Sequence, residues 1–206
     1  MRIGELIPLL SIVVQRGRCR TCGATIDPLH WQIEFACALA GCVALGVAPG
    51  FAGFAGALFG WMLIALIALD FGYFWLPDKL TLALAVAGLA AGLAGLTPSL
   101  SDRVYGGLAG YFSLAVIAFT YRHLRGREGL GGGDPKLLGA IGLWLGWQAL
   151  PLVALGGSGA GLLWVFARAL RGHAVSATDR LPLGALLGIA AFPVWIAVTS
   201  GYWGAA

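Results

Sequence analysis

Long apolar runs separated by short polar or glycine- and proline-containing breaks dominate the chain from residue 35 onward. The charge-free run 35–69 is broken at Pro49-Gly50, and it predicts two helices of about 17 residues each. Further helices are predicted from the charge-free stretches 80–101 and 104–121, from the two parts of 137–167 on either side of Pro151, and from 181 to the C-terminus. We therefore expect an all-α, polytopic membrane helix bundle of about seven membrane segments, in which the fifth, at about 136–149, is short.

Composition supports this assignment. The 206 residues are 59% hydrophobic and 11% charged, against about 25% charged residues in a typical soluble domain. The net charge of +4 is spread thinly, which excludes nucleic acid as a partner and leaves the lipid bilayer. We expect two parts: an interfacial, cytoplasmic N-terminal segment at 1–34, whose apolar piece at 7–14 is too short to span, and a membrane-embedded domain at 35–206.

The basic residues fix the expected orientation. If the segments alternate in direction, twelve of the thirteen Lys and Arg residues fall on one side, and only Arg103 falls on the other. By the positive-inside rule the basic side is the cytoplasm. The N-terminus is then cytoplasmic, and so are Asp70 and Asp134, which stand at the cytoplasmic ends of two different helices.

These two carboxylates are the candidates for chemistry. Asp70 closes an apolar run, where the helix dipole disfavours negative charge and no capping role explains it. Asp134 follows the stretch 126–133, in which five of eight residues are glycine, so that a substrate strand has room to approach. Asp134 before Pro135 also fits a helix N-cap. Two carboxylates brought together can share one proton and activate a water.

The surroundings of both carboxylates resemble the bacterial type IV prepilin peptidases, membrane aspartic proteases with a Gly-x-Gly-Asp motif. The resemblance lies in Asp70 with Leu76-Pro-Asp-Lys-Leu-Thr81, in Gly131-Gly-Gly-Asp-Pro-Lys136 with the apolar segment that follows it, and in the stretches 7–11 and 16–23. It covers about residues 7–155. The chain is therefore identified as a member of this family, N-terminally shortened relative to full-length relatives.

The resemblance implies a hydrolase that removes the short basic leader of a type IV prepilin or pseudopilin at the cytoplasmic face of the bacterial inner membrane. It implies Asp70 and Asp134 as the catalytic dyad, with no cofactor required for peptidase chemistry. Secondary site residues are Gly131, Gly133, Lys136 and Asp78. We interpret Asp78 mainly as an N-cap of its helix and Lys136 as a side chain that either snorkels to the interface or steadies the dyad.

The cysteines depart from the family pattern. Relatives often carry two Cys-x-x-Cys pairs that bind zinc, whereas Cys19 and Cys22 supply only half of a tetrahedral zinc site here. Cys37 and Cys42 lie within an expected span, where apolar packing is their natural role. The N-terminal region of full-length relatives is associated with methylation of the new pilin N-terminus, and we do not extend that activity to this chain.

Three alternatives remain at this level. A preflagellin-type or other Gly-x-Gly-Asp membrane peptidase would use the same two carboxylates. A transporter would more naturally place its polar groups near the middle of the bilayer, and these carboxylates are expected at one surface. A non-catalytic, degenerate member of the family would keep the residues without the activity.

Overall fold

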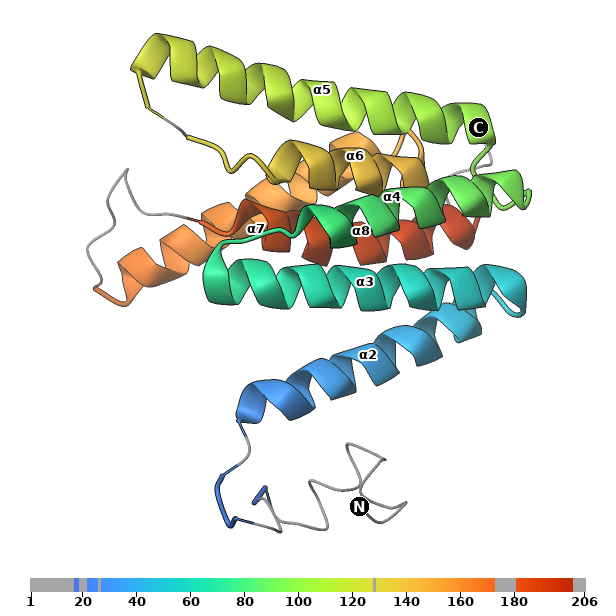
Figure 1. Cartoon of the computed structure of the whole chain (residues 1–206), viewed down its shortest axis with the longest axis horizontal. Coiled ribbons are helices and arrows are strands. Elements are labelled where there is room, and N and C mark those ends of the chain that lie inside the picture. The colour runs from blue at the N-terminus through green and yellow to red at the C-terminus, as the bar shows by residue number, and fades with distance from the viewer. Residues whose placement is uncertain (1–16, 19–21, 26, 128, 173–180, 202–206) are drawn as a thin grey trace.

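The computed structural model describes residues 17–18, 22–25, 27–127, 129–172 and 181–201. Within these ranges the chain forms seven helices and no strand longer than a single bridge between Arg18 and Thr25. The helices are α2 (Pro28–Val47), α3 (Phe51–Tyr73), α4 (Asp78–Leu93), α5 (Leu100–Arg125), α6 (Asp134–Leu145), α7 (Leu150–Leu170) and α8 (Leu183–Thr199). They run roughly parallel and antiparallel to one another along one long axis (Figure 1).

Seven helices occur where seven segments were predicted, so the all-α bundle is confirmed. Four of the described helices, α2, α3, α5 and α7, are long and apolar enough to cross a membrane. Helices α4, α6 and α8 have 16, 12 and 17 residues. At about 1.5 Å per residue, α6 is only about 18 Å long, well short of the ~30 Å hydrocarbon core. The structure thus has seven described helices with four clear candidate spans, and the count of about seven spanning segments stays a prediction.

The breaks between helices differ in detail from those expected. The turn at Pro49-Gly50 is present, with Gly50 at φ +78°. Within the predicted stretch 137–167, however, the break lies at Gly146 (φ +77°). Pro151 sits in the first turn of α7 instead of dividing the stretch. Proline fits a first turn because its missing N–H has no intrahelical partner there. Helix α2 also begins at Pro28, seven residues before the expected start of the membrane domain.

Helix α6 lies at the centre and packs against α4, α5 and α8 (Figure 1). Near its C-terminal end the Trp144 ring stacks on Phe59 of α3, with ring centroids 4.8 Å apart, and its Nε1 donates to the Leu84 carbonyl of α4 at 2.8 Å. On the opposite side α5 crosses α6 at glycines: a Cβ added at Gly142 would lie 2.2 Å from the Gly106 oxygen. Small residues thus let the two backbones touch, and the short helix is held from three sides.

Arg103, the one basic residue expected on the other side of the membrane, stands between the predicted segments 80–101 and 104–121. It lies in the first turn of α5 and is only 2% exposed. Its guanidinium donates to six backbone carbonyls, at 2.8–3.3 Å: those of Gly88, Leu96, Thr97, Pro98, Leu143 and Trp144. Since the last carbonyls of a helix have no partner within it, Arg103 satisfies two of those at the end of α6, Leu143 and Trp144, together with carbonyls of the connection between α4 and α5. Arg103 thus binds the carbonyls at a helix end inside the bundle.

Candidate functional site

Asp70 lies in the last turn of α3, where the sequence placed it. Its side chain is turned into the bundle and is 5% exposed. Its Oδ2 accepts a hydrogen bond of 2.7 Å from the backbone N–H of Ala185, 115 residues further along the chain. A buried carboxylate requires such a partner, because leaving its oxygens without one would cost several kcal/mol.

Asp134 is the first residue of α6 and is 7% exposed. The N-cap interpretation is wrong: Gly133 is the N-cap residue, and the Asp134 side chain makes no capping bond to the first turn of its own helix. Instead its Oδ2 accepts from the backbone N–H of Gly131, at 3.0 Å. The other oxygen remains directed toward α8, so the side chain faces the bundle interior.

The two carboxylates meet at the N-terminus of α8. A Cβ built on Gly184 would lie 3.1 Å from Oδ2 of Asp70 and 3.2 Å from Oδ1 of Asp134. Leu76, in the connection between α3 and α4, approaches the same point, with its Cδ1 2.7 Å from that Cβ position. Asp70 and Asp134 are thus brought together from the ends of two helices, as the sequence predicted, and α8 supplies the backbone against which they meet.

The environment shifts the titration of Asp134, which stands outside the four candidate spans. Burial, and then the negative charge of Asp70, raise its pKa from 3.8 to about 6. Hydrogen bonds from the backbone N–H groups of Gly131 and Gly184 oppose this rise, because they stabilise the ionised form. Near pH 6 the pair therefore holds one proton on Asp134 in a substantial fraction of molecules, which is the state that acid–base catalysis by two carboxylates requires.

The glycines before Asp134 are needed for space more than for backbone freedom. None of Gly131, Gly132 and Gly133 has a positive φ. A Cβ at Gly133 would lie 2.8 Å from Cβ of Leu76, and one at Gly131 would lie 3.1 Å from Oδ2 of Asp134, whereas a Cβ at Gly132 would meet nothing. Gly131 and Gly133 are therefore part of the site's construction, and the glycine between them is not.

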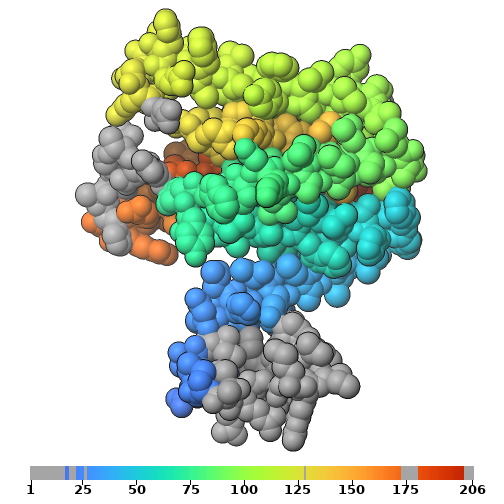
Figure 2. Space-filling view, viewed as in Figure 1, coloured from blue at the N-terminus to red at the C-terminus, as the bar shows by residue number. Residues whose placement is uncertain are grey.

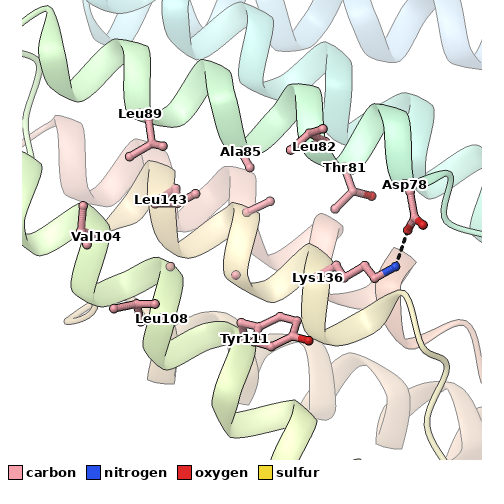
Figure 3. A pocket seen from close by; sticks show the side chains of 13 residues that line it. Asp78, Thr81, Leu82, Ala85, Leu89, Val104, Leu108, Tyr111, Lys136 and Leu143 are labelled. Atoms are coloured by element: carbon pink, nitrogen blue, oxygen red, sulfur yellow. Dashed lines mark hydrogen bonds and ion pairs between the residues drawn. The ribbon is translucent and has the colours of Figure 1, made fainter.

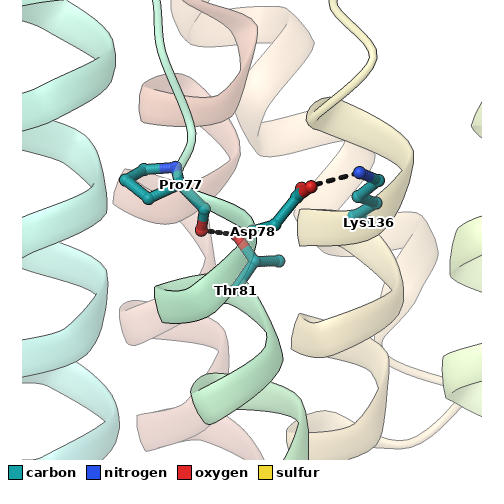
Figure 4. A network of polar contacts seen from close by, with 4 residues as sticks. All are labelled: Pro77, Asp78, Thr81 and Lys136. Carbon is teal, nitrogen blue, oxygen red and sulfur yellow. Dashed lines mark hydrogen bonds and ion pairs between the residues drawn. The ribbon is translucent and has the colours of Figure 1, made fainter.

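Asp78 and Lys136 form an ion pair next to the carboxylate pair. Asp78 is not an N-cap: Pro77 holds that position, and Asp78 is the first residue of α4. Lys136 Nζ donates to Asp78 Oδ1 at 2.6 Å, and Thr81 Oγ1 donates to the Pro77 carbonyl at 3.1 Å (Figure 4). The Lys136 side chain is 46% exposed and the Asp78 side chain 73% exposed. Lys136 thus joins α4 to α6 through Asp78, and neither charge belongs to the buried pair.

The ion pair stands at one end of an apolar groove of about 550 Å³ between α4, α5 and α6. Leu89 and Val104 lie at the far end, and Tyr111 lies near the charged end (Figure 3). In the space-filling view α6 shows between α4 and α5 (Figure 2). The groove opens on the face of α6 turned away from α3 and α8, so it is separate from the position where the carboxylates meet.

Only one of the two cysteines of the expected zinc half-site lies within the residues that the structure describes. Cys22 is exposed, in a loop that the Arg18–Thr25 bridge closes, and Cys19 lies outside the described residues. Among the residues that the structure describes, no cluster of three or more His, Cys, Asp or Glu side chains is found. The described side chains do not complete a tetrahedral set, and no step below uses a metal. Cys37 and Cys42 lie on α2, as expected, but Cys42 is exposed and Cys37 only half-buried, so the packing role expected for Cys42 is not seen.

A bundle of apolar helices that buries two carboxylates against a helix N-terminus defines a membrane protein with a site for acid–base chemistry. The chain belongs to the type IV leader peptidase family: the profile of that family matches residues 56–166, and the profile of the bacterial peptidase A24 N-terminal domain matches residues 1–47. The family resemblance inferred from the sequence is thereby confirmed, and the chain is a membrane protease.

Curated relatives support the same family. A protein of Aeromonas hydrophila is 43% identical over 199 residues, which cover 96% of this chain and 67% of the relative. A protein of Burkholderia pseudomallei is 41% identical, with 91% and 60% covered, and one of Pseudomonas aeruginosa is 40% identical, with 98% and 68% covered. All three are named prepilin leader peptidase/N-methyltransferase. No solved structure matches the chain.

Sequence reasoning missed three members of the site: Leu76, Gly184 and Ala185. Leu76 was noted only as part of a motif, and the stretch around Gly184 was not counted among the site residues. An apolar side chain and two backbone N–H groups carry no chemical signature in a sequence. The available signal was the pair Pro182 and Gly184 at the start of the last apolar segment, which marks a helix N-terminus without a side-chain cap.

Proposed function

We propose that the chain is an aspartic endopeptidase that removes the short basic leader from type IV prepilins or pseudopilins, with Asp70 and Asp134 as its catalytic dyad. The observation that carries the proposal is the convergence of these two buried carboxylates at Gly184. Capping of its own helix explains the burial of neither side chain, since Asp134 does not cap α6 and Asp70 lies near the C-terminus of α3.

The mechanism follows from the different surroundings of the two carboxylates. Asp70, ionised, takes a proton from a water, and the hydroxide that forms attacks the scissile carbonyl carbon. Asp134, protonated, donates its proton to the carbonyl oxygen. When the tetrahedral intermediate collapses, the C–N bond breaks and the proton held by Asp70 passes to the leaving amine. Asp134 takes back a proton from one hydroxyl of the intermediate as the C=O bond re-forms. The raised pKa of Asp134 favours its role as the acid.

We place the dyad at the cytoplasmic face of the bacterial inner membrane, with the N-terminus of the chain on the same side. Alternating helices bring the ends of α3, α5 and α7 and the starts of α4, α6 and α8 to one end of the bundle (Figure 1). The described basic residues other than Arg103 belong to that end or to the N-terminal segment. The positive-inside rule makes this end cytoplasmic, where a basic leader would be accessible. We divide the chain into an N-terminal interfacial segment and a peptidase domain that begins with α2 at Pro28 instead of at the expected residue 35.

The substrate class rests on the relatives, each of which is named for prepilin leader cleavage. The same dyad would also serve a preflagellin-type substrate, so the test includes one. The names of the relatives also include N-methyltransferase, and the region that matches the family's N-terminal domain spans residues 1–47. Our proposal is limited to the peptidase activity.

The experiment is co-expression with a type IV prepilin, a pseudopilin and a preflagellin, with leader removal scored by mass spectrometry. We expect the wild type to cleave the prepilin or pseudopilin, and we expect Asp70→Asn and Asp134→Asn to reduce cleavage by about 10³-fold or more while the protein still inserts in the membrane. The same spectra show whether the new N-terminus is methylated. Absence of cleavage of all three substrates by a well-inserted wild type would identify a degenerate member of the family.

A further inference from the structure

The N-terminus of α8 has no capping side chain of its own. Pro182 stands at the N-cap position and makes no side-chain bond to the first turn. The first N–H groups of a helix have no intrahelical acceptor, and they carry a partial positive charge. Ala185 is fully buried, so its N–H cannot be left to bulk water. Asp70, on α3, provides the missing acceptor at 2.7 Å.

Gly184 sits between that bond and the second carboxylate. The point where its Cβ would lie is 3.1 Å from one carboxylate, 3.2 Å from the other and 2.7 Å from Leu76. The 2.7 Å approach to Leu76 is closer than real Cβ atoms come, so the flexible end of that side chain would have to shift. The approaches of 3.1 and 3.2 Å would require the carboxylates or the first turn of α8 to give by a few tenths of an ångström. The absence of a side chain is what lets the backbone of α8 come this close to both acids.

We propose that Gly184 is a positioning residue of the dyad: the first turn of α8 orients the Asp70 and Asp134 carboxylates through backbone N–H groups, and it reaches them only because residue 184 has no side chain. The inference rests on the proposed function. It assigns no new chemical step, since the proton transfers remain those of the two carboxylates. It does make α8 a third contributor to the site, beside α3 and α6.

The same helix offers a matched control. Gly188 lies one turn further along α8 and also faces α3, and a Cβ there would approach Cγ1 of Ile67 to 2.8 Å. The steric demand is similar, but the neighbours at position 188 are aliphatic side chains and no carboxylate. If Gly184 served only to let α8 pack against α3, alanine at either position would have the same kind of effect.

A second variant separates packing from positioning at the site itself. The closest neighbour of the added methyl group is Leu76 Cδ1, so Leu76→Ala combined with Gly184→Ala removes the severest overlap. The contacts of 3.1 and 3.2 Å with the carboxylate oxygens remain. We expect the double variant to regain thermal stability relative to Gly184→Ala without regaining activity.

The experiment measures kcat, KM, the pH profile of kcat and the melting temperature in detergent for the wild type, Gly184→Ala, Gly188→Ala and the double variant. A displacement of reacting groups by about 1 Å can cost about 10²-fold. We expect Gly184→Ala and the double variant to lose about that much in kcat with KM within about threefold of wild type, and the pH profile to shift because the two carboxylates are held differently. Gly188→Ala should keep the wild-type pH profile and kcat within about threefold, whatever its melting temperature.

Two results would overturn the inference: wild-type kcat and pH profile in either Gly184 variant, or equal losses of kcat in Gly184→Ala and Gly188→Ala that follow the loss of melting temperature. Failure of the proposed function is distinguished in the same assay, because then the wild type itself does not cleave. If Gly184→Ala does not accumulate in the membrane, the kcat and pH profile of the double variant test the inference, since the overlap with Leu76 is removed in it.

Discussion

The backbone N–H of Ala185 donates a 2.7 Å hydrogen bond to the carboxylate of Asp70, and so a helix near the C-terminus of the chain is capped by a side chain from its second described helix. A buried carboxylate needs hydrogen-bond donors, and the first N–H groups of a helix need acceptors. This one bond meets both needs. Assembly of the site and docking of α8 are therefore one event.

The raised pKa of Asp134 makes stability depend on pH. The native state holds this proton more tightly than the unfolded chain, so the group's stabilising contribution is complete below its ordinary pKa of 3.8 and is lost as pH rises to about 6. At about 1.36 kcal/mol per pKa unit the loss amounts to about 3 kcal/mol. We expect Asp134→Asn to be inactive and yet more stable than wild type above pH 6, with the difference in melting temperature shrinking toward pH 4. A difference that does not vary with pH would contradict this account of the shift.

Removing the guanidinium of Arg103 should be severely destabilising. Up to six backbone carbonyls would lose their donor, and truncation of a buried, hydrogen-bonded charge typically costs about 3–5 kcal/mol. We expect Arg103→Met to lower the free energy of unfolding in detergent by that amount. We expect Arg103→Lys to fail too, because a compact ammonium cannot reach carbonyls on several segments at once. The control is Arg122→Met, an exposed position in the last turn of the same helix, which should change stability by about 1 kcal/mol or less.

The Asp78–Lys136 ion pair should contribute little to stability or catalysis. Both partners are exposed, and such pairs are usually worth about 0.2–1 kcal/mol. A double-mutant cycle with Asp78→Asn and Lys136→Gln should give a coupling energy in that range. Cleavage by each single variant should stay within about tenfold of wild type, since neither side chain reaches the buried carboxylates. Loss of activity as complete as in Asp134→Asn would instead make Asp78 a third catalytic acid.

The three glycines before Asp134 should respond unequally to alanine. A methyl group at Gly133 overlaps with Leu76, which in turn touches the point where the carboxylates meet, whereas a methyl group at Gly132 meets nothing. We expect Gly133→Ala to lower the rate of leader cleavage by about tenfold or more, through displaced reacting groups. Gly132→Ala, one position away, should cleave at the wild-type rate. Equal sensitivity at both positions would point to backbone flexibility as the common requirement.

Much of the helical architecture could be predicted from the sequence, because charge-free runs and glycine or proline breaks are read along the chain without knowledge of contacts. The turn at Pro49-Gly50 was placed correctly. The break near Gly146 was assigned to Pro151 instead, since proline is the stronger breaker inside a helix and its acceptability in a first turn depends on where the helix starts. The short length of α6 was expected, but the bonds of the distant Arg103 guanidinium to its last carbonyls could not be predicted, because they depend on how α5 packs against α6.

The two candidate catalytic residues were also accessible from the sequence, because Asp70 and Asp134 interrupt or border apolar segments where a carboxylate is costly. The pairing of Lys136 with Asp78, 58 residues away, was not, and local rules favoured a cap and a snorkelling lysine. Local rules equally favoured Asp134 as the cap of α6. Asp78 is bound by a tertiary partner instead of capping its helix, whereas Asp134 accepts from Gly131, three residues before it, and from Gly184 of α8.

The bonds of Arg103 also bear on how the protein is made. Four of its six carbonyl acceptors, in residues 88–98, are synthesised before it, and two, those of Leu143 and Trp144, are synthesised about 40 residues later. When α5 enters the membrane, its guanidinium can already be shielded by the preceding helix and loop. When α6 packs against α5, its two carbonyls complete the set of acceptors around the guanidinium. The order of residues along the chain therefore lets this buried charge be inserted with four of its six acceptors already present.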